Sequence, residues 1–182
     1  YSVTLIQQIF DGLVQFDQNL NVVPALATSW IVSSDGLVYT FNLRSNANFH
    51  NGRQVTAEDF VYSFTRILDP KEESSALGFF ERLKGAAAYR NGESNKVSGL
   101  RALDGHTLEI TINEPYAPFL PVLAMISSKV VPREEVERWG KNFSHHPVGT
   151  GPFRLESWEG NQIVLSANSD YHEGPPHLDR VV

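Results

Sequence analysis

Apolar and polar residues alternate along residues 37–44. The apolar members stand at every second position: Leu37, Tyr39, Phe41 and Leu43. A period of two places these side chains on one face, so the segment is predicted to form a strand with one buried face. Asp35-Gly36 comes directly before it, and glycine accepts the positive φ of tight hairpin turns. The pattern therefore predicts a hairpin centred on residues 35–36.

A helical pattern follows at residues 56–68, where apolar residues recur at a spacing of three and four. They are Phe60, Val61, Phe64, Ile67 and Leu68. Thr56 with Asp59 is typical of a capping box, because the hydroxyl can accept a free N–H of the first turn and the acid suits the positive helix end. Asp69-Pro70 should end the helix, and Asn51-Gly52 predicts a turn before it.

Three other stretches complete the first two thirds of the chain. Residues 5–13 keep helical spacing, with Gly12 where a helix would end. Residues 80–89 suggest a helix that ends at Asn91-Gly92, and residues 107–112 alternate after a hairpin signal at Asp104-Gly105. Eight residues from these elements are predicted to be buried together: Tyr39, Phe41, Leu43, Phe60, Phe64, Leu108, Ile110 and Ile112.

The last third alternates short helices and strands. Proline is tolerated in the first turn of a helix, so a short helix is predicted to begin near Pro118. A second helix is predicted over residues 133–139 and should end at Gly140. Residues 153–158, 162–167 and 178–182 are predicted to be strands.

Composition narrows the classes of function. The chain has 182 residues, 41% of them hydrophobic and 20% charged, which is ordinary for a globular protein. A net charge of −6 argues against nucleic acid as a partner, because phosphate binding needs concentrated Lys and Arg. There is no cysteine, so disulfides and thiolate metal sites are excluded. The apolar runs are too short to span a bilayer.

No cluster of residues predicts catalysis, a metal or a cofactor. His145 and His146 are adjacent, but a metal site usually needs three or four convergent ligands, so they are interpreted as surface residues. The run Pro147-Val148-Gly149-Thr150-Gly151-Pro152 could expose N–H groups to an anion. It lacks the lysine of a phosphate-binding loop and is interpreted as a tight turn before the strand at residue 153.

Several of these segments together resemble the extracellular solute-binding proteins of family 5, the oligopeptide, dipeptide and nickel receptors of ABC importers. The resemblance rests on an ordered series of motifs. They are Phe10-Asp11-Gly12-Leu13, Pro24-Ala25-Leu26-Ala27 before Ser29-Trp30, Ser34-Asp35-Gly36, Tyr39-Thr40-Phe41-Asn42-Leu43-Arg44, Phe49-His50-Asn51-Gly52, Val55-Thr56-Ala57-Glu58-Asp59-Phe60, the run at residues 147–153, and Asn168, Tyr171, Gly174 and Pro176. The series spans nearly the whole chain.

The resemblance implies an α+β mixed, periplasmic-binding-protein-like fold of class II, cluster C. It implies a small inserted α/β domain II at residues 11–133 and pieces of domain I at residues 1–10 and 134–182. Domain III, the second lobe, is expected to be absent, so the chain is expected to be a fragment. The sheet of domain I would then have an unpaired edge, which predicts self-association through that edge.

The implied function is capture of a small solute, in particular a peptide, and its delivery to the membrane subunits of an ABC transporter. The implied location is periplasmic or extracellular and membrane-associated, with no enzymatic activity. A competing interpretation is the effector-sensing domain of a transcriptional regulator, since some regulators carry a similar domain. In peptide receptors of the family a tyrosine after Asp-Pro contacts the peptide, but that position is Ala76 here. Ala76, Phe79 and Phe80 are the predicted ligand-binding residues.

Overall fold

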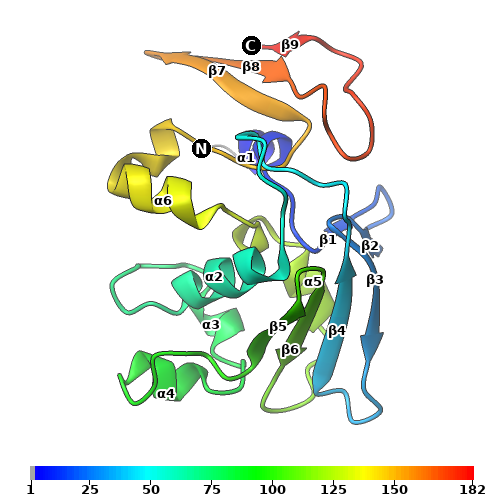
Figure 1. Ribbon diagram of the computed structural model, residues 1–182, viewed down its shortest axis with the longest axis vertical. Coiled ribbons are helices and arrows are strands. Elements are labelled where there is room, and N and C mark those ends of the chain that lie inside the picture. The colour runs from blue at the N-terminus through cyan, green and yellow to red at the C-terminus, as the bar shows by residue number, and fades with distance from the viewer. Residues whose placement is uncertain (1–2) are drawn as a thin grey trace.

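The computed structural model describes residues 3–182 and contains three antiparallel sheets with helices packed against them: a small β1-β2 sheet and two larger sheets (Figure 1). The first two residues of the predicted segment 1–10 lie outside the described part. The strands are β1 Val14–Phe16, β2 Val22–Pro24, β3 Ala27–Val32, β4 Val38–Leu43, β5 Leu100–Asp104, β6 Thr107–Thr111, β7 Phe153–Glu159, β8 Gln162–Ala167 and β9 Arg180–Val181. The helices are α1 Val3–Ile9, α2 Ala57–Ile67, α3 Leu77–Phe80, α4 Ala86–Arg90, α5 Phe119–Leu123, η1 Ile126–Ser128, α6 Arg133–Trp139 and η2 Gly140–His145.

A four-stranded antiparallel sheet with the order β3-β4-β6-β5 forms the centre of the larger part. Tyr39 pairs with Ile110, and Phe41 pairs with Leu108, so both strands turn their apolar faces to the same side. Gly36 has a φ of 72° between β3 and β4, as the hairpin turn requires. The predicted strands and both predicted hairpins are therefore confirmed.

Helix α2 covers the apolar face of this sheet. The N–H of Thr56 donates to Oδ2 of Asp59 at 2.8 Å, which confirms the predicted capping box at the helix start. Phe60 and Phe64 are completely buried against the sheet. The eight residues predicted to be buried together all belong to one hydrophobic cluster, called here the large cluster. Its buried members lie between Leu13 and Val130.

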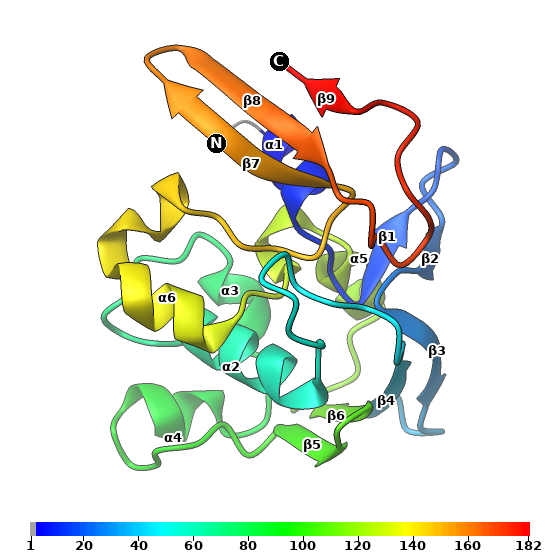
Figure 2. The same cartoon turned by 45° about the horizontal axis from the view of Figure 1, so that its top comes forward.

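The three-stranded sheet, β7-β8-β9, lies at one end of the molecule (Figure 1). Helix α1 packs beneath the β7-β8 hairpin (Figure 2). Four buried residues hold this part together, and they form what is called here the small cluster: Ile9, Phe10, Phe153 and Leu165. None of the described helices has the length and apolar character needed to cross a membrane.

The predicted helix at residues 80–89 was wrong. The chain forms two short helices, α3 and α4, because Leu83 between them bridges Ile112 and the N–H of Lys84 donates to the carbonyl of Thr111 at 2.9 Å. Pairing with the sheet therefore takes the backbone groups that a continuous helix would need.

Two other predicted elements are shorter than expected. Helix α1 ends at Ile9, ahead of Gly12, because Gly12 bridges Lys129 as in an antiparallel sheet. Strand β9 is limited to two residues, which pair with Leu165 and Ser166. The predicted helices after Pro118 and at residues 133–139 are confirmed as α5 and α6, and the strands at residues 153–158 and 162–167 are confirmed as β7 and β8.

The glycine-rich run joins the two parts of the chain, since the N–H of His50 in the loop after β4 donates to the carbonyl of Gly149 at 2.8 Å and the end of α1 packs against the run. The N–H of Gly151 donates to the carbonyl of Ile9 at 2.9 Å. A Cβ on Gly149 would lie 1.9 Å from the carbonyl oxygen of Ile9, and a Cβ on Gly151 would lie 2.5 Å from that of Gln8. Glycine is therefore required at both positions by the approach of the end of α1. The run bends at residues 150–152 before it enters β7, but it forms no hydrogen-bonded turn there, so the interpretation as a tight turn is not confirmed.

Candidate functional site

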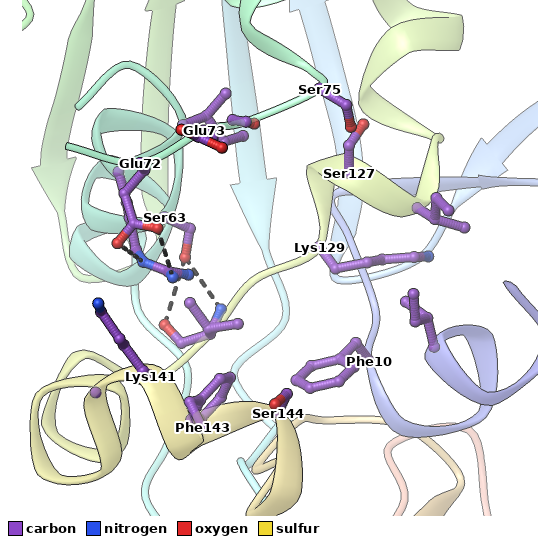
Figure 3. Close-up of a pocket in the computed structure, with 17 residues that line it drawn as sticks. Phe10, Ser63, Glu72, Glu73, Ser75, Ser127, Lys129, Lys141, Phe143 and Ser144 are labelled. Atoms are coloured by element: carbon purple, nitrogen blue, oxygen red, sulfur yellow. Dashed lines mark hydrogen bonds and ion pairs between the residues drawn. The ribbon is translucent and has the colours of Figure 1, made fainter. Parts of the chain in front are cut away.

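A cavity of about 670 Å³ lies between the large and the small cluster (Figure 3). Its walls come from α1, α2, the loop at residues 72–75, η1 and η2. Both clusters supply lining residues, so the cavity depends on how the two parts of the chain pack together. Its volume is typical of sites for small organic ligands.

One wall is apolar. Phe10 and Phe143 lie with their ring centroids 6.3 Å apart, and Ile6 and Val131 extend this wall. Phe10 is 93% buried by its packing in the small cluster, which leaves only a small part of the ring to face the cavity. This wall can contact the apolar part of a ligand but offers it no hydrogen bonds.

The opposite wall is polar and is held by its own hydrogen bonds. Arg66 donates to both carboxylate oxygens of Glu72 at 3.2 Å, which orders the loop after α2. Ser63 donates to the carbonyl of Asp59 at 2.7 Å and accepts from the N–H of Val131 at 3.0 Å. These bonds fix α2 to the segment before α6 and hold the polar wall in place.

Two hydroxyl groups lie at another side of the cavity. Figure 3 shows Ser75 and Ser127 pointing toward each other. The hydroxyl of Ser127 is buried and has no hydrogen-bond partner among the described residues. A buried hydroxyl without a partner is unfavourable, so a polar ligand group at this position would be stabilised.

Lys129 and Asp11 introduce buried charge beside the cavity. Burial lowers the pKa of Lys129, and the charge of Asp11 partly offsets this effect. Burial raises the pKa of Asp11 to about 6, against the opposing influence of Lys129 and of a hydrogen bond from Thr150. The Thr150 hydroxyl donates to Oδ2 of Asp11 at 3.1 Å and accepts from its N–H at 3.1 Å. Asp11 is therefore held by the run that joins the clusters.

The cavity suits binding of a small molecule that carries charge and apolar groups. Its lining contains two acids, Glu72 and Glu73, and three basic residues, Arg66, Lys129 and Lys141. Within residues 3–182 no group of three or more His, Cys, Asp or Glu is placed to hold a metal ion. The expectation that the chain holds no metal and no cofactor stays a prediction.

The predicted ligand-binding residues lie next to the cavity but do not line it. Ala76 is 2% exposed, and Phe80 is fully buried with its ring 5.1 Å from that of Phe64. Phe79 is half-buried and packs against the large cluster. The lining ends one residue earlier, at Ser75. Ligand contact by these three residues stays a prediction.

The adjacent histidines are exposed, as expected. His145 stacks on Trp158 at 4.7 Å between centroids, and His146 stacks on Trp139 at 3.5 Å. The two rings therefore contact different tryptophans and do not converge on a common point.

Sequence reasoning missed Phe10, Ser127, Lys129 and Phe143 as lining residues. Phe10 belongs to a motif that was used for the family resemblance, which is the one available signal. The other three stand in segments without a recognisable pattern, and only the folded chain brings them together.

Comparison with known proteins identifies similar chains. Residues 21–182 match the family described as bacterial extracellular solute-binding proteins, family 5 Middle. The dipeptide-binding protein DppE of Bacillus subtilis is 36% identical over 184 residues, covering 97% of this chain and 33% of that protein. The periplasmic oligopeptide-binding protein OppA of Escherichia coli is 33% identical over 171 residues, covering 91% of this chain and 31% of that protein.

A solved structure shows the same fold. The substrate-binding domain of an oligopeptide ABC transporter from Bacillus anthracis matches with a TM-score of 0.87 and 33% identity, over 93% of this chain and 34% of that chain. The expected fold class is therefore confirmed. The chain spans about a third of the length of each of these three relatives.

Proposed function

Because this chain belongs to the bacterial extracellular solute-binding proteins of family 5, we propose that it forms part of a receptor that captures a peptide or a similar small solute and delivers it to an ABC transporter. The observation that carries this proposal is the cavity between the two clusters, which offers an apolar wall and charges of both signs. A peptide has an apolar or polar side chain beside a charged amine and a charged carboxylate, so the chemistry of the walls suits it.

The proposed role is binding without chemical conversion. The hydrogen bonds of Ser63 and Arg66 hold structure in place, and the named relatives are binding proteins. The membrane subunits of the transporter are the proposed partners, and association with the membrane is part of the proposal. No observation favours the alternative of a sensing domain in a transcriptional regulator.

The proposed division of the chain is domain II at residues 11–133 and pieces of domain I at residues 1–10 and 134–182. The two clusters support it, since the buried members of the large cluster fall between Leu13 and Val130. Those of the small cluster, Ile9, Phe10, Phe153 and Leu165, fall on either side of that range. The cavity would then lie at the border of the two domains, where ligand sites are common.

The test is calorimetric titration of the full-length protein with di- and tripeptides. Ser75→Trp adds a large ring at an exposed position that lines the cavity, so it should weaken peptide binding at least tenfold without unfolding the protein. Ser34→Trp is the matched control, because Ser34 is an exposed serine in the hairpin between β3 and β4. Phe79→Ala tests the predicted contact with the ligand at Phe79, which is the least buried of the three predicted ligand-binding residues.

Absence of binding to every peptide would reject the peptide receptor. If both tryptophan variants bind peptides as the unmodified protein does, the cavity is not the site. If Phe79→Ala leaves the affinity unchanged, the predicted contact at Phe79 is wrong even though the receptor stands.

A further inference from the structure

Lys129 is fixed at the cavity by backbone pairing. It stands between η1 and α6, where it bridges Gly12, and the N–H of the next residue, Val130, donates to the carbonyl of Asp11 at 3.0 Å. This short ladder joins the segment before α6 to the turn after α1. The Cα of Lys129 is therefore held in place, and only its side chain is free to adjust.

The ammonium group of Lys129 lacks a partner in the part of the chain that the structure describes. No hydrogen bond or ion pair holds it, although the side chain is partly buried. Arg66, by contrast, is neutralised by two hydrogen bonds to Glu72. Burial of a cation without a partner is unfavourable, and a nearby anion would remove much of that cost.

Asp11 does not supply this anion. It influences the pKa of Lys129 through its charge, but no contact within ion-pair distance joins the two groups. Its carboxylate instead accepts a hydrogen bond from the hydroxyl of Thr150. The ammonium group therefore has no anion in direct contact among the described residues.

The side chain of Lys129 lies apart from the other charged groups that line the cavity. Figure 3 shows Lys129 extending away from Glu72 and Lys141, on the side of Phe10. The acids Glu72 and Glu73 belong to the loop after α2, on the other side of the view. One end of the cavity thus offers the positive charge of Lys129, whereas the other end carries the acids together with Lys141 and with Arg66, which is paired with Glu72.

We propose that Lys129 determines specificity by binding a carboxylate of the peptide ligand, an inference that rests on the proposed function. A carboxylate fits because it can accept hydrogen bonds from an ammonium group and neutralise it in a partly buried place. The ligand amine would then lie toward Glu73, because Glu72 is paired with Arg66. The carboxylate can be the C-terminus of the peptide or an acidic side chain, and the experiment distinguishes them.

The experiment is calorimetric titration of the full-length protein with three probes: trialanine, trialanine with a C-terminal amide, and Ala-Glu-Ala with a C-terminal amide. Lys129→Met removes the charge and keeps the length of the side chain, whereas Lys129→Arg keeps the charge. Lys96→Met is the control, since Lys96 is an exposed lysine in a loop away from the cavity.

We expect Lys129→Met to weaken binding of a carboxylate-bearing probe about tenfold or more and to change binding of trialanine amide less than threefold. If Lys129→Met loses affinity only for trialanine, the C-terminal carboxylate of the peptide is the partner of Lys129. If it loses affinity only for the Ala-Glu-Ala amide, the acidic side chain of the peptide is the partner. Lys129→Arg should restore most of the affinity, and Lys96→Met should change none of the three.

A melting curve distinguishes this role from a structural one. Replacing an unpartnered buried cation by methionine should leave the melting temperature unchanged or raise it. If Lys129→Met instead lowers it strongly, Lys129 is a structural counter-ion of Asp11 and the proposal is overturned.

Two other results also overturn it. Equal affinity of Lys129→Met and the unmodified protein for all probes rejects the role of Lys129 and leaves the receptor standing. Equal weakening of all three probes shows that the side chain contributes only packing. If the unmodified protein binds no peptide at all, the proposed function fails and this inference fails with it.

Discussion

Acidification should destabilise the protein through His50. This side chain links the loop after β4 to the run that joins the two clusters: its Nε2 lies 3.0 Å from the carbonyl oxygen of Gly151, and its Nδ1 accepts from the N–H of Gly149 at 3.3 Å. One nitrogen must donate and the other must accept, so the ring is neutral in this arrangement. Protonation would place a second N–H against the N–H of Gly149.

The magnitude follows from the shift in pKa. Burial, which outweighs the hydrogen bond to Gly151, lowers the pKa of His50 to about 4, compared with 6.5 for an ordinary histidine. The unfolded chain therefore binds a proton below pH 6.5 while the folded chain does not. The contribution of neutral His50 to the free energy of unfolding is therefore fully present above pH 6.5. It decreases below that pH and is lost as the pH falls through 4. A difference of about 2.5 pKa units corresponds to roughly 3 kcal/mol, of which about 2.5 kcal/mol is lost by pH 4.5.

Two other groups titrate in the same range, so the effect must be measured as a difference. Burial also lowers the pKa of His172 to about 4, which adds to the loss of stability on acidification. The raised pKa of Asp11, about 6, acts in the opposite direction, because the folded protein takes up that proton first. The unmodified protein alone therefore shows only the sum of the three groups.

The assay is urea unfolding at pH 7.5 and pH 4.5 for the unmodified protein and for His50→Gln, which does not titrate. The free energy of unfolding of the variant should fall by about 2.5 kcal/mol less over this interval. His177→Gln is the control, since that side chain is exposed. The same pH dependence in the unmodified protein and in His50→Gln would refute the reasoning.

Three further outcomes are expected. Phe41→Ala should lower the free energy of unfolding by about 3–5 kcal/mol in denaturant titration because the ring is fully buried, and an unchanged value would contradict its place in the core. Gly149→Ala should lower the melting temperature sharply, since its Cβ would lie 1.9 Å from a carbonyl oxygen, whereas Gly78→Ala, with open space around it, should not. In the 182-residue chain the amide hydrogens of β7 and β8 should exchange faster than those of β4 and β6, because their sheet has only two long strands and packs on the small cluster. The chain should also self-associate through the free edge of β7. Equal protection in a strict monomer, measured by hydrogen exchange and light scattering, would reject that expectation.

The sequence predicted the elements in which local signals agree. Along residues 35–44 the turn at Gly36, the alternation and the β-branched and aromatic residues all favour the same hairpin. At residues 80–89 the spacing of apolar residues favours a helix, but Leu83 pairs with Ile112 across the sheet. The contact between Leu83 and Ile112, which are far apart in the sequence, prevents a continuous helix, and local sequence patterns cannot predict such a contact.

The candidate site was less predictable for a related reason. The family resemblance directed attention to the residue at position 76, and the lining of the cavity ends at Ser75. The predicted position is therefore adjacent in sequence to the lining of the cavity, but the sequence alone did not determine the direction of its side chain. Ala76 turns inward to the large cluster because the loop closes there into α3.

The cavity belongs to neither cluster alone, and this fact connects stability to binding. Phe10 and Phe143 come from the small cluster or pack against it, whereas Ser63 and Arg66 come from α2 on the large cluster. Gly149 joins the two parts, because its carbonyl accepts from the N–H of His50 at 2.8 Å while the end of α1 lies close against it. A change at the joint should therefore alter the shape of the cavity even in molecules that stay folded. Ligand binding, which contacts both walls, should in turn hold the two clusters together and raise the stability of the joint.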